Sequence, residues 1–332
     1  MIITAGNMDL LWRGISTKYG LALSPSKAWS VASGLLEILP MTTLREEQYW
    51  LANLPPMQRL TKDKVFNSLS AFGQTITAAE WDLSFAIKRK YVKYDQWGLL
   101  NQAVIKAADR GSKLTDFALS DFLMNNPMYQ TGTGAYMTYD QQPYFSTQHP
   151  INGNGPIGDF PAGAPTVQSN LLLNTPLTVT NFAAAVAMMM SYLDETGRPW
   201  SVTPDTLIVG PALRHIGKEI CEMDLIADVS AAAGSSTVMV QRNPEMNTTK
   251  LVVVPEMWRM PQSWMLVCSS GTTKPFVWAQ LEAPHLVSSI DPTSVNVFKA
   301  QEFWYSVEAL GEIAPTLWPL AIMATGGSTY GT

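Results

Sequence analysis

The feature of the sequence that most constrains the fold is a change in hydrophobic periodicity near residue 94. Before it, apolar side chains occupy every second position, at Trp81, Leu83, Phe85 and Ile87. This period of two predicts a strand with one apolar face. Over residues 94–125, apolar or small residues recur in steps of three or four, which predicts one helix about 48 Å long, with a kink at Gly111-Ser112. A helix of this length is expected to act as a strut.

The predicted strand belongs to a hairpin over residues 57–93, with Gln74–Thr77 as its expected partner. A two-stranded hairpin is marginal by itself in water, so its apolar face needs a neighbour. Just after that face comes a basic cluster, consisting of Lys88, Arg89, Lys90 and Lys93. We expect the basic cluster to contact an acidic neighbour or to form a solvated strand edge, because only Tyr91 and Tyr94 could stack on bases. If the chain is one subunit of an assembly, that neighbour is another subunit, and the candidate inter-subunit contact residues are Trp81, Leu83, Phe85, Ile87, Lys88, Arg89, Lys90 and Lys93.

Residues 1–56 are expected to form an arm. A short amphipathic helix over Met8–Gly20 would end at Gly20, and a second helix is predicted over residues 26–39, before Pro40. The arm has apolar residues but no evident core of its own. We therefore expect it to pack on another part of the chain or on a neighbouring subunit.

Residues 126–175 are rich in proline and glycine, and a loop of this length in a compact domain indicates hidden short strands or contacts with neighbours. The segment contains G-x-G-x-x-G at Gly153, Gly155 and Gly158. A dinucleotide loop needs a strand before this motif and a helix after it, and Pro156 opposes that helix. We interpret the motif as a turn. His149 lacks the pattern of a nucleophile or metal site.

Residues 176–275 are typical of a compact α/β unit. Thr180 is expected to cap a helix that ends at Gly197, a buried strand follows near 205–210, and Pro211 opens another helix. Further strands are expected near residues 236–240, 250–257 and 263–270. Residues 276–332 are predicted to return as strands, with residues 294–314 long enough for one or more extended strands.

The composition favours a protein whose surface meets other subunits. Hydrophobic residues make up 46% and charged residues only 15% of the 332 residues, well below the usual quarter. The net charge of −5 supplies no global basic field for nucleic acid. Cys221 and Cys268 lack paired spacing, which fits buried thiols in a reducing compartment. No signal peptide is indicated, and the apolar run over residues 181–193 is too short to span a bilayer.

The residues that could support chemistry do not converge in the sequence. The three histidines are dispersed, and Gly271–Pro275 lacks the spacing of a phosphate-binding loop. We expect no catalytic, cofactor or metal site. A cytoplasmic nucleotide-binding enzyme or hydrolase stays as the alternative from another functional class.

The order of arm, hairpin, strut, α/β unit and return strands resembles the major capsid proteins of tailed bacteriophages. Several stretches resemble the Mu-like phage major head subunit family, including "TTLREEQYWLANLPPMQRL", "YDQQPYFSTQHP", "PDTLIVGPAL", "NPEMNTTKLVVVPEM", "KPFVW" and "VFKAQEFWYSVEALGEIAPTLW". This chain has Gln141 where the family often has glycine after its tyrosine-aspartate pair. Its first 40 residues match poorly. The resemblance implies that residues 139–160 form a stiff structural connector, in which His149-Pro150 locks a turn.

The resemblance implies an α+β fold with an N-terminal arm (1–56), an extended β-hairpin loop (57–93), a peripheral domain (94–175, with a spine helix over 94–125 and a connector), an axial domain (176–275) and return strands that complete the peripheral domain (276–332). It implies a structural protein without cofactor that forms hexamers and pentamers of an icosahedral shell around double-stranded DNA, without sequence-specific binding. Scaffold, portal and head accessory proteins are the implied partners, with assembly in the bacterial cytoplasm and a final place in the virion. An encapsulin-like compartment shares this fold and is the second alternative.

Overall fold

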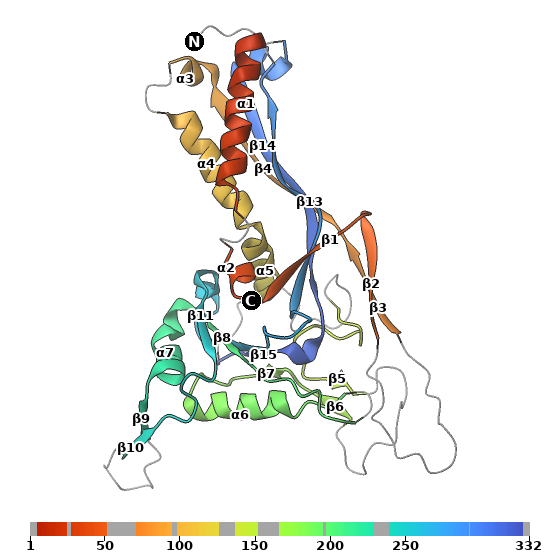
Figure 1. The fold of residues 1–332 in the computed structure, drawn as a ribbon, viewed down its shortest axis with the longest axis vertical. Helices are drawn as coiled ribbons and strands as arrows, with labels where there is room; N and C mark the ends of the chain where they lie inside the picture. Colours follow the sequence, from red (N-terminus) through yellow and green to blue (C-terminus); the bar gives the residue numbers. More distant parts are fainter. Residues whose placement is uncertain are drawn as a thin grey trace.

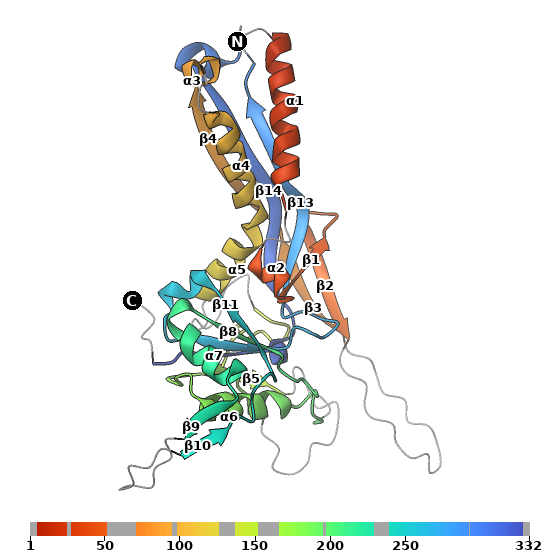
Figure 2. The same ribbon diagram turned by 60° about the vertical axis from the view of Figure 1, so that its left-hand side comes forward.

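The molecule consists of an elongated spine standing on a compact base, with a hairpin that projects from their junction (Figures 1 and 2). The structure is a computed structural model, and it describes residues 5–24, 28–51, 71–94, 98–125, 137–151, 166–194, 197–228, 239–291 and 293–327. None of the helices within these ranges is both long and apolar enough to cross a membrane.

The spine is built on a four-stranded sheet, the spine sheet, whose strand order is β1-β13-β14-β4. Its strands are β1 (Leu36–Pro40), β4 (Ala79–Lys88), β13 (Phe276–Ser289) and β14 (Glu302–Pro315). β14 runs antiparallel to both of its neighbours, whereas β1 joins β13 in parallel. Side chains alternate along β14 between buried and more exposed, so the sheet has an inner, covered face and an outer face.

Two helices cover the inner face of the spine sheet: α1 (Ala5–Ala22) and α4 (Leu99–Ser112) (Figure 2). Their apolar sides form a separate core with the sheet, which includes Met8, Ile15, Val104, Phe303 and Tyr305. The helix predicted to end at Gly20 continues to Ala22, because a glycine in a helix costs only about 1 kcal/mol and this packing outweighs it. Thus the first part of the predicted arm packs on its own chain.

The predicted strut helix over 94–125 is two helices, α4 and α5 (Leu114–Asn125), with the non-helical Lys113 between them. The break lies directly after the Gly111-Ser112 pair, where the sequence predicts a kink. Gly111 is tightly packed there, since a Cβ atom at this position would lie 2.9 Å from the Tyr19 hydroxyl oxygen. The expected single helix was therefore wrong, although the expected point of bending was right.

The second helix predicted in the arm was also wrong. Only α2 (Trp29–Ala32) is helical, and Gly34, with a φ angle of 77°, turns the chain into β1. Local helix propensity loses to tertiary structure here, because β1 pairs with β13 and buries Leu36. The carboxylate of Asp116 holds the start of α2 by accepting from the backbone N–H groups of Trp29 (3.2 Å) and Ser30 (2.9 Å).

The projecting hairpin consists of β2 (Arg45–Leu51) and β3 (Ala71–Thr77). The predicted pairing of Gln74–Thr77 with Trp81–Ile87 was therefore wrong. β3 and β4 are separated by Ala78 alone, which leaves no room for the reversal that a hairpin needs. β4 pairs instead with β14, so the Trp81–Ile87 stretch is part of the spine and not of a projecting loop. Residues 52–70 lie outside the described ranges.

The base contains a five-stranded sheet with the order β11-β8-β12-β15-β7. Its strands are β7 (Leu171–Leu172), β8 (Thr206–Val209), β11 (Lys250–Val253), β12 (Trp264–Val267) and β15 (Ala321–Ala324). Because β15 lies in this sheet, residues 276–332 do not all return to the spine, and the expected boundary was wrong at its C-terminal end. β8, β12 and β15 are buried along their whole length, which places the main core of the molecule here.

Around the base sheet lie the helices α6 (Val179–Met190) and α7 (Arg214–Glu222) and the short strand pair β9 (Leu225–Asp228) and β10 (Met239–Arg242). The cap of α6 is Thr178, which accepts from the N–H of Asn181, and not the predicted Thr180. The remaining short elements are α3 (Arg89–Lys93), β5 (His149–Pro150), β6 (Val167–Gln168), η2 (Pro211–Leu213), η3 (Pro255–Arg259), η4 (Asn296–Ala300) and η5 (Trp318–Leu320). The proline-rich connector thus contains short strands, one of the two alternatives that the sequence left open.

Candidate inter-subunit interface

Contacts within the chain cover part of the apolar face of β4. The Trp81 indole donates to the carbonyl of Gly311 at 3.0 Å, and Phe85 stacks on Tyr305 with 5.3 Å between ring centroids. Ile87 packs against the same core beneath the helices, whereas Leu83 is 41% exposed. The spine sheet therefore supplies the neighbour that the sequence argument sought in another subunit. Contact of these four side chains with a second copy stays a prediction.

The basic cluster lies at the far end of the spine, where β4 passes into α3 (Figure 1). Lys88, Arg89, Lys90 and Lys93 are all exposed, and none of them forms an ion pair within the described residues. Buried Val92 anchors the helix in the spine core. The structure thus presents the four cations together at one tip, which agrees with an intermolecular role and does not test it.

Sequence reasoning missed a second part of this tip. Residues 296–300, expected to be extended, form the helical turn η4, with Val295 and Phe298 exposed by 69% and 79%. The backbone N–H of Arg89 donates to the carbonyl of Gln301 at 2.8 Å, which ties α3 to the end of η4. The adjacent apolar pair Val297-Phe298 breaks the period of two and was the available signal. The spine tip therefore combines exposed cations with exposed apolar groups.

A buried polar cluster in the connector centres on His149. Its ring is fully buried and stacks on Trp318 at 4.3 Å between centroids. Nδ1 lies 2.6 Å from a carboxylate oxygen of Asp140, and Nε2 lies 3.1 Å from Oδ1 of Asn170. Thr138 donates to the other carboxylate oxygen of Asp140. His149 lies in β5, so the expectation that His149-Pro150 locks a turn was wrong; the pair is held by a strand contact with β6.

Asn170 joins this cluster to the base. Its Nδ2 donates to the carbonyls of Tyr144 (2.7 Å), Trp318 (3.2 Å) and Ala321 (3.2 Å), and its Oδ1 accepts from the N–H of Ser146 (2.9 Å). These groups come from two stretches of the chain, residues 144–146 of the connector and residues 318–321 of the base, and all are buried around one amide. The geometry gives His149 and Asn170 a cross-linking role between the connector and the base.

The loop at Gly271–Pro275 is held by structural hydrogen bonds. The Lys274 ammonium donates to the carbonyls of Ser269 and Gly271. Asp205, before β8, accepts from the N–H groups of Ser269 (2.8 Å) and Ser270 (2.6 Å). Burial alone would raise the pKa of Asp205, but these bonds and those from the Thr206 and Ser269 hydroxyls outweigh it and lower the pKa. Lys274 is thus engaged by the protein's own carbonyls.

No group of three or more potential metal-binding side chains occurs within the described residues. The three glycines of the G-x-G-x-x-G motif lie outside the described ranges. Of the residues weighed for chemistry, His149 and Lys274 are thus engaged in internal hydrogen bonds, whereas the spine tip and the outer face of the spine sheet carry exposed charged and apolar side chains.

Comparison with solved structures identifies the fold. The procapsid protein of bacteriophage JBD30 matches with a TM-score of 0.54 and 18% identity, covering 97% of this chain and 76% of that chain. The bacteriophage JBD30 capsid matches with a TM-score of 0.51 and 17% identity, covering 71% of this chain and 92% of the other. A chain of Microbacterium phage Oxtober96 matches with a TM-score of 0.52 and 11% identity, and the match covers 90% of each chain. The predicted α+β fold of the tailed-phage major capsid proteins is confirmed.

The family follows from sequence. The model of the family "Mu-like prophage major head subunit gpT" matches residues 8–174, 160–257 and 243–327. The chain belongs to this family, as the sequence resemblance indicated. A curated relative, the Mu-like prophage FluMu major head subunit of Haemophilus influenzae, is 23% identical over 143 residues. That alignment covers 42% of this chain and 42% of the relative, so the chain aligns with less than half of that protein.

Proposed function

We propose that this protein assembles with copies of itself into hexamers and pentamers that close an icosahedral head around double-stranded DNA. The observation that carries the proposal is the family match, whose three segments together extend from residue 8 to residue 327. Assembly takes place in the bacterial cytoplasm, and the finished shell belongs to the virion. Scaffold, portal and head accessory proteins act as partners, and the shell binds the DNA without reading its sequence.

The shape of the chain supports assembly in physical terms. The β2–β3 hairpin projects from the junction of spine and base (Figures 1 and 2), and a two-stranded hairpin is marginal in water. The spine tip also exposes Tyr94, Val295 and Phe298 by 68%, 69% and 79%. Contacts with other copies would cover such surfaces. We infer that the basic cluster and the apolar residues of β4 lie at or near one of these contacts.

Purified protein, expressed alone or with the scaffold from the same prophage, should sediment as capsomers, tubes or shells and show closed particles by negative-stain electron microscopy. Association driven by these surfaces rises with concentration, so dilution should release subunits. A chain that stays monomeric at high concentration, with and without scaffold, would contradict the proposal.

The same preparation separates the two alternatives. A cargo protein captured inside particles that hold no DNA would favour an encapsulin-like compartment. An increase of the melting temperature with NAD or ATP, lost in Gly155→Val, would favour a nucleotide-binding enzyme. For a head subunit we expect neither result.

A further inference from the structure

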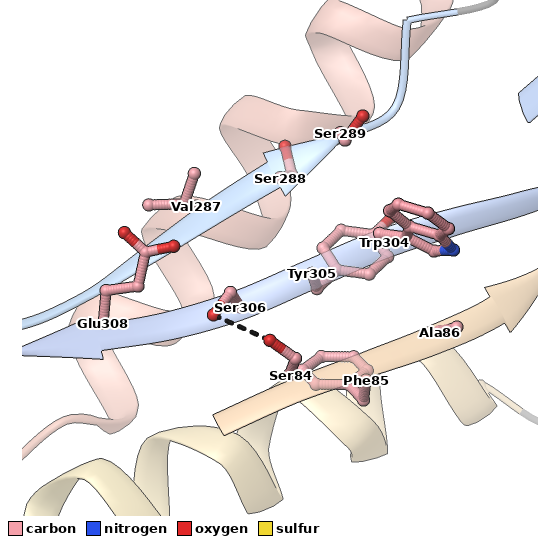
Figure 3. Close-up of a pocket in the computed structure, with 10 residues that line it drawn as sticks. All are labelled: Ser84, Phe85, Ala86, Val287, Ser288, Ser289, Trp304, Tyr305, Ser306 and Glu308. Atoms are coloured by element: carbon pink, nitrogen blue, oxygen red, sulfur yellow. Dashed lines mark hydrogen bonds between the residues drawn. The ribbon is translucent and has the colours of Figure 1, made fainter. Parts of the chain in front are cut away.

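The outer face of the spine sheet, opposite the helices, contains a long groove. One part, about 440 Å³ in volume, crosses β13, β14 and β4 between Glu308 and Trp304 (Figure 3). An adjoining part of about 590 Å³ shares Ser84, Ser306 and Glu308 with the first and continues toward the base. We call this surface the acidic groove, and its residues are Glu80, Asp82, Ser84, Glu282, Val287, Trp304, Ser306 and Glu308.

Strand register concentrates carboxylates in the acidic groove. Asp82 lies directly opposite Glu308, and in the next outward-facing row Glu80 and Glu282 lie on either side of Leu310. Like charges directly opposite each other destabilise a sheet. The Ser84 hydroxyl donates to Asp82, and none of the four carboxylates forms an ion pair within the described residues.

The histidine next to this row does not balance the charge. His285 is in register with Glu308, but its Nδ1 lies against the carbonyl of Ala283 at 3.2 Å. The acidic groove therefore presents four carboxylates together with the exposed apolar side chains of Val287 and Trp304. It fits a partner that brings both cations and apolar contact area.

The spine tip has that complementary chemistry. Arg89, Lys90 and Lys93 lie on α3 beside exposed Tyr91 and Tyr94, and the ammonium groups of Lys90 and Lys93 each lie 5.1 Å from the neighbouring tyrosine ring. Within its own chain the tip lies too far from the groove carboxylates to pair with them, although it adjoins the Trp304 end of the groove. Lys88 is six residues from Asp82 along β4, about 20 Å at the usual rise per residue, which exceeds the Debye length of about 8 Å at physiological salt.

We propose that the acidic groove of one subunit receives α3 of a second copy. Arg89, Lys90 and Lys93 of one chain then face the four carboxylates of the other, while Tyr91 and Tyr94 pack against Val287 and Trp304. This contact rests on the proposed function, because only an assembly brings two spines together. It relieves two repulsions at once, that among the carboxylates and that among the cations.

Reciprocal charge reversal tests the pairing. Arg89→Glu with Lys90→Glu alters the tip, and Asp82→Lys with Glu308→Lys alters the groove. We expect each pair to lower the yield of closed shells by about tenfold at about 50 mM salt and by less at about 500 mM, because salt screens exposed charges. All four changes in one chain should raise the yield above that of either pair alone, because the two reversed positions of the tip can then pair with the two reversed positions of the groove, although Lys93, Glu80 and Glu282 keep their charges.

A matched control is Lys106→Glu with Arg214→Glu, which makes the same net-charge change as the tip variant at exposed positions of α4 and α7. It should assemble like the wild type. Sedimentation and negative-stain microscopy measure shell yield, and circular dichroism of the unassembled fraction checks folding. If the wild type forms shells and the charge-reversal pairs form them equally well, the proposed pairing is wrong and the head function stands. The same conclusion follows if the quadruple variant gives a shell yield as low as either pair. A wild type that never assembles would overturn both.

Disulfide cross-linking provides a second test, which does not require the charge-reversal variants to fold. Asp82→Cys with Lys90→Cys places one thiol in the groove and one at the tip, while the native Cys221 and Cys268 are buried. Oxidation of assembled protein should link chains into covalent ladders on a denaturing gel, and neither single variant should form them. Single chains after oxidation of intact shells would contradict the contact.

Discussion

Replacement of Asn170 by alanine should destabilise the subunit severely, because one buried amide joins the connector to the base. The change removes the acceptor of the Ser146 N–H and the donor to the Tyr144 carbonyl, and it leaves Nε2 of His149 without its amide partner. Each buried polar group left without a partner costs about 1–3 kcal/mol. After partial relaxation we expect a loss of about 3–5 kcal/mol, which includes the small cavity.

Two further variants separate hydrogen bonding from packing. Asn170→Asp keeps the side-chain volume but replaces the donor that faces three carbonyls, so it should destabilise at least as much as alanine. Asn181→Ala removes a similar amide–carbonyl bond, from Nδ2 to the carbonyl of Pro176 at 2.8 Å, at an exposed site. There water replaces the lost partner, and we expect a change below about 0.5 kcal/mol.

Urea unfolding of the unassembled subunit, followed by tryptophan fluorescence, measures these differences as shifts in midpoint at constant slope. If Asn170→Ala lowers the free energy of unfolding by less than about 1 kcal/mol, the argument that unpartnered buried polar groups dominate the cost is refuted. A nearly neutral Asn170→Asp would show that volume, and not the hydrogen-bond network, matters at this position.

Two further predictions concern the base. At Gly326 (φ 57°) an added Cβ would lie 1.9 Å from the carbonyl oxygen of Gln262, whereas Gly327 (φ 86°) has open space. Gly326→Ala should therefore lower stability by more than about 3 kcal/mol and Gly327→Ala by only about 1–2 kcal/mol, as measured by thermal unfolding; equal losses would contradict this steric argument. The lowered pKa of Asp205 gives stability that is present above the unfolded value of about 3.9 and is lost as pH falls toward the folded pKa. Asp205→Asn should therefore cost about 1–2 kcal/mol at pH 7 and progressively less in acid, and a difference from the wild type that does not change with pH would exclude this linkage.

The sequence was informative about single elements and poor about which strands pair. Alternation at Trp81, Phe85 and Ile87 indicated a strand, but a period of two does not name a partner. The partner, β14, begins at Glu302 and is far away in the chain, whereas the nearer Gln74–Thr77 was the wrong choice. The overall order of parts was recognised through resemblance to a family, which carries long-range information that local patterns lack.

The candidate interface shows the same limit. The basic cluster is contiguous in the sequence and could be found there. The acidic groove could not, because its carboxylates come from three strands, β4, β13 and β14, and meet only through the register of the spine sheet. The prediction of a second arm helix was wrong for a similar reason, because pairing of β1 with β13 outweighs a local helical preference.

The separation of the cores explains why assembly and folding can be tested independently. The spine core beneath α1 and α4 and the main core of the base are distinct apolar clusters joined by the long strands β13 and β14. The charges of α3 and of the acidic groove project away from both cores, and only Val92 anchors α3 inward. Exposed charge changes usually alter stability by less than about 0.5 kcal/mol. A reversal at the spine tip should therefore leave the subunit folded, so a loss of shells would report on the contact between copies.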